Sequence, residues 1–222
     1  MANITPLPGT VQPAPSGLKG FDTVATISST LAIQFLNSGY SFCIRYLSLG
    51  NGQSSSDLSN AEATNILNAG LALCAVQHVF DAGWVPTQAL GATNGTNAAS
   101  NAKSIGLPAG MNIWCDLEGV ANGSTAQSVI DYCDAWYAAV NSAGYVPGLY
   151  VGAGSVLSSQ QLYQNLSFQH YWKSQSDVPV VATRGYQMVQ LLPPSVMVNG
   201  IGIDMDTTQN DNEGGTVLWL KV

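Results

Sequence analysis

Asp116 and Glu118 are separated by a single leucine at the end of an apolar run. Residues two apart in a β-strand point to the same face, and at about 3.3 Å per residue their backbones lie roughly 6.6 Å apart. Their carboxyl groups could then sit near the ~5–5.5 Å separation of retaining glycosidases or the ~6.5–9.5 Å separation of inverting ones. Neighbouring carboxylates raise each other's pKa, and burial raises it further. The pair therefore indicates an acid and a base built from one residue type.

More acidic residues end other apolar runs, although the chain carries little charge. Asp22 ends one run, and Asp204 and Asp206 end another. Only 13 of the 222 residues are acidic, yet five of them stand at three such ends. A structural role, as partners of Arg45 or as caps of the following loops, would explain one such acid more easily than five. We therefore favour a functional cluster of carboxyl groups.

Polar and aromatic side chains near the remaining strand ends are candidates for binding a substrate. With the acids they form the set Asp22, Arg45, Tyr46, Gln77, Tyr150, Trp172, Gln187, Gln190, Asp204 and Asp206. Rings such as Tyr150 and Trp172 stack on sugars but also fill barrel cores, so both interpretations stay open. His78 follows Gln77 and fits a loop position better than a pocket. The cysteines and histidines lack the close spacing of a metal site, so we expect no metal or organic cofactor.

The elements that must position these residues alternate between strand and helix. Apolar runs predict strands at 17–22, 42–46, 71–77, 111–116, 148–151, 168–172, 185–190 and 200–205, and an extra terminal strand at 216–222. Helical patterns follow the first five runs, and Ser59 to Glu62 and Ser124 to Gln127 match capping boxes at two helix starts. The alternation predicts an α/β fold. We expect a parallel (β/α)-barrel of the TIM type, with about five β/α units followed by loop-connected strands.

The start of the chain differs from the rest. Four prolines and little periodicity predict a Pro-rich N-terminal arm or linker over residues 1–16. Residues 17–222 fit a single barrel domain, which commonly has this size.

Composition narrows the possible partners. The net charge is −7 with only six Lys or Arg, which disfavours nucleic acid because few cations could neutralise phosphates. No run approaches the ~18 apolar residues of a membrane span. Charged residues make up 9% of the chain, which suits an extracellular or cell-surface protein. The N-terminus lacks signal-peptide features, so we expect another export route or a removed signal. No coiled-coil pattern is present, and we expect a monomer.

Short motifs in a fixed order carry a family resemblance. They are Lys19-Gly20-Phe21-Asp22, Arg45-Tyr46-Leu47, Leu58-Ser59 with Glu62-Ala63, Ala69-Gly70-Leu71, Asn97-Ala98, Ile105-Gly106-Leu107-Pro108, Gly144-Tyr145 with Pro147-Gly148 and Tyr150, and Gly202-Ile203-Asp204. In this order and spacing, from about Gly17 to Asp206, the chain resembles the glycoside-hydrolase-like family known as domain of unknown function 1906.

That family is similar to the family-25 glycoside hydrolases, which are muramidases acting on peptidoglycan. The resemblance implies that Glu118 is the general acid and that Asp116 stabilises the transition state or assists the substrate. Asp22 and Asp204 would position the substrate and tune the pair. The implied activity is cleavage of a glycosidic bond in an amino-sugar polymer such as peptidoglycan. A non-catalytic carbohydrate-binding or cell-surface module on the same barrel is the alternative.

Overall fold

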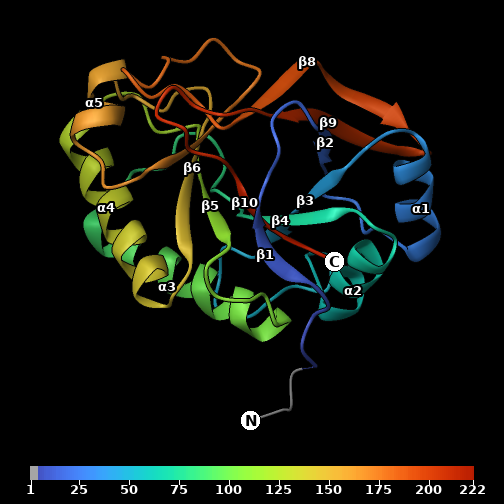
Figure 1. Cartoon of the computed structure of the whole chain (residues 1–222). Helices are drawn as coiled ribbons and strands as arrows, with labels where there is room; N and C mark the ends of the chain where they lie inside the picture. Colours follow the sequence, from blue (N-terminus) through green and yellow to red (C-terminus); the bar gives the residue numbers. More distant parts are fainter. Residues whose placement is uncertain (1–4) are drawn as a thin grey trace.

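Eight strands close into a barrel in the computed structural model, which describes residues 5–222 (Figure 1). In chain order they are β2 (Lys19–Asp22), β3 (Phe42–Leu47), β4 (Ala72–Gln77), β5 (Asn112–Leu117), β6 (Val146–Val151), β7 (His170–Lys173), β8 (Met188–Val198) and β9 (Ile201–Thr208). Pairing of β4 with β5, and of β9 with both β8 and β2, completes the ring. The predicted α/β barrel is confirmed.

Five helices in the described chain surround the barrel, one after each of its first five strands (Figure 1). They are α1 (Ser29–Asn37), α2 (Asn60–Asn68), α3 (Gln88–Ile105), α4 (Ala126–Ser142) and α5 (Ser159–Gln164). Each begins after a serine or threonine whose hydroxyl accepts a hydrogen bond from a first-turn amide. The expected five β/α units followed by loop-connected strands are therefore present. Over residues 5–222, no helix combines the length and the apolar character that crossing a membrane requires.

Two helix starts differ from the predicted capping boxes. Helix α4 is capped by Thr125 rather than Ser124, so it begins one residue later than expected. At α2 the Ser59 hydroxyl does accept a hydrogen bond from the Glu62 amide, but the Glu62 carboxylate turns to Arg45 instead of completing the box. The acid that the sequence pattern assigns to helix capping thus serves as the partner of a buried cation.

Strand alternation divides the apolar side chains into two cores. The core inside the barrel includes Phe42, Ile44, Cys74, Val76, Trp114, Trp172, Met188 and Trp219. The larger core, between barrel and helices, takes the outward-facing strand residues. Two inward glycines make room for large rings, because a Cβ at Gly20 would lie 2.3 Å from the Phe42 ring and one at Gly148 would lie 2.4 Å from the Trp114 ring. In both pairs the glycine stands directly across from the ring on the neighbouring strand.

The last barrel strand corrects the expectation of a parallel barrel, because β9 runs antiparallel to both β8 and β2. The cause is a tight hairpin at Asn199-Gly200, where φ is 50° and 87°. An Asn-Gly pair with both residues in the left-handed region is the preferred two-residue hairpin turn. Strand β8 also runs past the predicted end at Gln190 to Val198, through an irregularity between Leu191 and Val196.

The two ends of the described chain pair with each other next to β4 (Figure 1). Strand β1 (Thr10–Pro13) runs antiparallel to β10 (Leu218–Lys221), and β10 contacts the start of β4 through Leu220 and Leu73. The predicted terminal strand is therefore present. Part of the predicted N-terminal arm is a paired strand and not a linker, whereas residues 1–4 of that arm lie outside the described residues.

Close packing of α3 on α4 depends on Gly91, where an added Cβ would lie 2.1 Å from the Tyr132 carbonyl oxygen. We expect Gly91→Ala to lower the free energy of unfolding by about 1–3 kcal/mol, because overpacking outweighs the ~1 kcal/mol that alanine gains over glycine in a helix. Gly50→Ala is the control, since no atom lies within 4 Å of its added methyl group. Equal effects of the two changes in urea denaturation would contradict the packing argument.

Candidate active site

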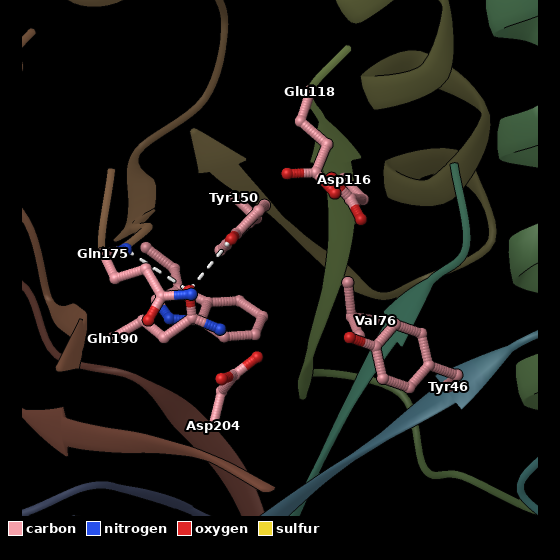
Figure 2. A pocket seen from close by; sticks show the side chains of 9 residues that line it. Tyr46, Val76, Asp116, Glu118, Tyr150, Gln175, Gln190 and Asp204 are labelled. Atoms are coloured by element: carbon pink, nitrogen blue, oxygen red, sulfur yellow. Dashed lines mark hydrogen bonds between the residues drawn. The ribbon is translucent and has the colours of Figure 1, made fainter. Parts of the chain in front are cut away.

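A pocket of about 170 Å³ lies at the end of the barrel where the parallel strands finish (Figure 2). Its lining residues are Tyr46, Val76, Asp116, Glu118, Tyr150, Trp172, Gln175, Gln190 and Asp204. Each strand from β3 to β9 contributes a residue from within the strand or directly after it. In barrel enzymes this carboxyl end of the strands is where active sites are built.

Strand β5 brings Asp116 and Glu118 to the pocket together, because the intervening Leu117 points outward into the helix-facing core. Figure 2 shows both side chains extending from β5 toward the pocket, with Asp204 entering from β9 on the other side. Gly152 after β6 leaves the space that Glu118 occupies, since a Cβ there would lie 2.4 Å from the Glu118 Cβ. The Trp84 indole donates a 2.7 Å hydrogen bond to the Glu118 carbonyl oxygen and so holds the strand end.

Asp22 does not line this pocket but lies in the adjoining one, where two neutral donors hold it. The Tyr46 hydroxyl donates to its Oδ1 at 3.1 Å, and the Gln190 amide donates to its Oδ2 at 2.8 Å. Gln190 is oriented in turn, because its Oε1 accepts hydrogen bonds from the Tyr150 hydroxyl and from the Gln175 backbone N–H (Figure 2). A continuous chain of hydrogen bonds therefore links one wall of the pocket to the opposite one.

The antiparallel β9 brings two further acids to this region at different depths. Asp204 stands directly across from Asp22 and lines the pocket, where its Oδ1 accepts a 2.6 Å hydrogen bond from the Ser195 amide. Asp206 is fully buried below the pocket, and its Oδ1 accepts a 2.8 Å hydrogen bond from the Trp172 indole. Asp206 is therefore a supporting residue under the site and not one of the residues that line it.

Burial and mutual repulsion raise the pKa of the carboxyl groups in this cluster. Burial is the main cause for Asp116, whose pKa lies well above its ordinary value, and the charges of Glu118 and Asp22 raise it further. The pKa of Glu118 is raised by burial and by Asp204. Burial raises the pKa of Asp22 to about 6, although its hydrogen bonds act in the opposite direction. The pKa of Asp206 is raised by burial and by Asp22.

Two predicted substrate-binding residues, Arg45 and Gln77, point away from the pocket. Arg45 is fully buried between barrel and helix, where its Nε donates to the Glu62 carboxylate at 2.6 Å. The Gln77 side chain also faces outward, accepting from the Trp136 indole at 2.7 Å and donating to the Asn94 carbonyl at 2.8 Å. Both predictions were wrong because each residue lies one position from an inward-facing one, and alternation sends it to the opposite face.

Gln187 is also misplaced by the sequence prediction. It precedes β8 and therefore lies at the far end of the barrel from the pocket. Its amide donates to Asp211 and to the Gln169 carbonyl. The predicted strand at 185–190 begins before β8, which starts at Met188. Gln187 was therefore predicted to lie within a strand and near the pocket, although it precedes β8.

The structure adds residues that sequence reasoning missed. Gln175 lines the pocket from the loop after β7, and Val76 forms part of its floor. Ser195 supplies the amide that binds Asp204, with a φ of 51° in the irregular part of β8. The only sequence signal for Gln175 is its place shortly after a strand end, whereas nothing local marks Ser195.

A family model now places this geometry among known proteins. The model of the Rv2525c-like, glycoside hydrolase-like domain matches residues 33–215. The chain belongs to this family. The resemblance inferred from the sequence motifs is thereby confirmed, and the domain is glycoside hydrolase-like in fold. No protein in the curated set matches the chain.

Solved structures with the same fold include secreted and hydrolytic proteins of bacteria. The Tat-secreted protein Rv2525c of Mycobacterium tuberculosis, solved with L-tartrate, has a TM-score of 0.64 at 15% identity, covering 88% of this chain and 96% of that one. The lysozyme of Streptomyces coelicolor has a TM-score of 0.61 at 16% identity, and the match covers 89% of this chain and 94% of the lysozyme. A family 25 glycosyl hydrolase of Bacillus anthracis has a TM-score of 0.60 at 16% identity, and the match covers 89% of this chain and 91% of the hydrolase. At these identities the likeness establishes the shared barrel.

Replacement of Asp204 tests the coupling of charges across the pocket. The Asp204 carboxylate raises the pKa of Glu118, so we expect Asp204→Asn to lower that pKa. The shift would be measured by carbon-13 NMR titration of the Glu118 carboxyl resonance. Asp131→Asn, an exposed change on α4, is the control and should leave the resonance unchanged. An unshifted Glu118 titration in Asp204→Asn would show that the two groups do not interact.

Asp22 links the site to pH-dependent stability. Its pKa rises from 3.8 to about 6 on folding, so the folded state binds this proton more tightly than the unfolded state. Its stabilising effect is present below the unfolded-state pKa and is lost as the pH rises through the folded-state pKa. We expect Asp22→Asn to raise the free energy of unfolding at pH 8 by on the order of 2–3 kcal/mol, and by less at pH 4. Urea denaturation showing the same difference at both pH values would contradict this.

Proposed function

We propose that this chain is a glycoside hydrolase that cleaves a glycosidic bond in an amino-sugar polymer, and that the polymer is peptidoglycan. The observation that carries the proposal is the convergence of Asp116 and Glu118, side by side on β5, with Asp204 across the same pocket. Asp22 lies beside this pocket and accepts hydrogen bonds from two of its lining residues, Tyr46 and Gln190. Glycoside hydrolysis commonly needs two carboxyl groups beside the scissile bond, one to donate a proton and one to support positive charge.

Glu118 is the general acid in this proposal. Its side chain is only partly buried, so a glycosidic oxygen entering the pocket can reach it. The raised pKa of Glu118 keeps a proton available at higher pH than an ordinary glutamic acid would. Glu118 then protonates the leaving oxygen as the bond to the anomeric carbon breaks, which is the step that general acid catalysis accelerates. A water molecule completes the hydrolysis by adding to the anomeric carbon and giving up a proton to a carboxylate of the site.

Asp116 supports the developing positive charge from deeper in the pocket. Coupled carboxyl groups such as Asp116 and Glu118 share one proton over the interval between their two deprotonation steps. In the free protein burial and the charges of Glu118 and Asp22 raise the pKa of Asp116. A sugar ring that gains positive charge favours the ionised form of Asp116, so the proton of the pair lies on Glu118, which donates it to the leaving oxygen.

The remaining pocket residues are suited to binding an uncharged sugar. Tyr150, Gln175 and Gln190 provide neutral polar groups, and Trp172 provides part of an aromatic wall. Carboxylates such as Asp204 accept hydrogen bonds from sugar hydroxyls.

Three features support peptidoglycan and a location outside the cytoplasm. Proteins described as a bacterial lysozyme and as a family 25 glycosyl hydrolase share the barrel over most of their length. Another protein with this barrel is described as Tat-secreted. With little charge in its composition, the chain fits an extracellular or cell-surface role, and we propose that it acts there as a monomer.

Replacement of the proposed acid is the direct test. We expect Glu118→Gln to reduce hydrolysis about 10²–10⁴-fold, because the amide cannot donate the proton that the leaving oxygen needs. The assay is mass spectrometry of soluble products from purified peptidoglycan and from chitin-type oligomers. Muropeptides with a new reducing end, released by the wild type and not by Glu118→Gln, would support the hydrolase and identify its bond.

Two controls separate catalysis from binding. Asp131→Asn, on the exposed face of α4, should match the wild type in product release. Sedimentation of each protein with insoluble peptidoglycan reports binding without any reaction. Retained binding by wild type and by Glu118→Gln, with no product from any polymer, would refute the hydrolase and leave a non-catalytic carbohydrate-binding module.

A further inference from the structure

His78 lies directly behind a wall of the pocket although it does not line the pocket. It follows β4, and its ring stacks on the ring of Tyr46 at 4.4 Å between centroids, with 22° between the planes. Tyr46 is the residue whose hydroxyl donates to Asp22 at 3.1 Å. The Tyr46 ring is therefore held at its outer end by Asp22 and across its face by His78.

The His78 ring is itself fixed by the loop between β3 and α2. The Asp57 carboxylate binds His78 Nε2 through Oδ1 at 2.9 Å, and it accepts a 2.5 Å hydrogen bond from the Ser48 hydroxyl through Oδ2. Asp57 is buried, whereas the side chain of His78 keeps about a third of its surface exposed. Both ends of the Asp57 carboxylate are thus occupied, which fixes the plane that it presents to His78.

The same loop is anchored to the backbone of Tyr46. The Gln53 side-chain amide donates to the Tyr46 and Leu58 carbonyl oxygens at 3.1 Å each, and the Leu58 backbone amide donates to the Tyr46 carbonyl at 3.0 Å. From the helix side, the Asn101 amide donates to the Ser48 carbonyl at 3.0 Å. The loop that carries Asp57 and the strand that carries Tyr46 are therefore one connected unit.

We propose that His78, held by Asp57, is a positioning residue that fixes the Tyr46 ring so that its hydroxyl stays on Asp22. An isolated tyrosine at the mouth of a pocket has rotamer freedom, and a flat ring packed on one face removes it. With Tyr46 fixed, Asp22 keeps both of its neutral donors. This positioning is independent of the proposed function, whereas its effect on hydrolysis rests on that function.

The test compares His78→Ala with the conservative His78→Phe. The alanine variant removes the stacked ring, and the phenylalanine variant keeps a flat ring while losing the contact with Asp57. The first readout is the pKa of Asp22, which carbon-13 NMR measures from the titration of its carboxyl resonance in the full-length protein. Because the Tyr46 hydrogen bond lowers the pKa of Asp22, we expect His78→Ala to raise that pKa in the same direction as Tyr46→Phe, and His78→Phe to restore most of the wild-type value.

The double variant His78→Ala with Tyr46→Phe distinguishes positioning from general loosening. If His78 acts through the Tyr46 hydroxyl, the double variant should shift the Asp22 titration no further than Tyr46→Phe alone. An unchanged Asp22 titration in His78→Ala, in a variant that retains the wild-type circular dichroism spectrum, would overturn the proposal. The proposal would also be overturned if the double variant shifted the Asp22 pKa by the sum of the shifts that the two single variants cause.

Hydrolysis of peptidoglycan provides the second readout. We expect His78→Ala to lower kcat/KM about tenfold, the size of effect expected when one hydrogen bond to a charged group is loosened. If the wild type releases no product, the proposed function fails, but the Asp22 titration still decides whether His78 positions Tyr46. If the wild type is active and His78→Ala is equally active with an unshifted Asp22, only the positioning proposal fails.

Discussion

Closure of the barrel by the antiparallel β9 is the constraint on which the site depends. The hairpin at Asn199-Gly200 reverses the chain, so β9 enters between β8 and β2 and pairs with both. Asp204 is thereby held opposite Asp22, although the two residues stand near opposite ends of the sequence. Without this pairing the acids on β5 would face an open edge, and the charge coupling across the pocket would be absent.

The second constraint is the separation of charges by strand alternation. The carboxyl groups of the site point inward, whereas the guanidinium of Arg45 points outward and is paired with Glu62. Asp22 is therefore held by the neutral donors Tyr46 and Gln190, which orient its carboxyl group without cancelling its charge. Burial with like-charged neighbours then raises the pKa of the acids in the site, at a cost to the stability of the folded protein.

Much of the site could be predicted from the sequence because strands alternate with a period of two. Asp116 and Glu118 share a face for that reason, and the family motifs include Asp22 and Asp204. Site residues were predicted wrongly where they were chosen because they end an apolar run, without asking to which face of the strand their side chain points. Arg45 beside Tyr46 is the clearest example, because one step along a strand exchanges the pocket for the helix-facing layer.

The sequence by itself determined the order of strands and helices, the family and the β5 acid pair, because these depend on local periodicity and on motifs that are contiguous in the chain. Only the tertiary structure decided which groups meet. The direction of β9, the burial of Asp206 below the pocket and the stacking of His78 on Tyr46 depend on contacts between distant segments. Such contacts form when the barrel closes, and neither propensity nor spacing along one segment determines the distances across it.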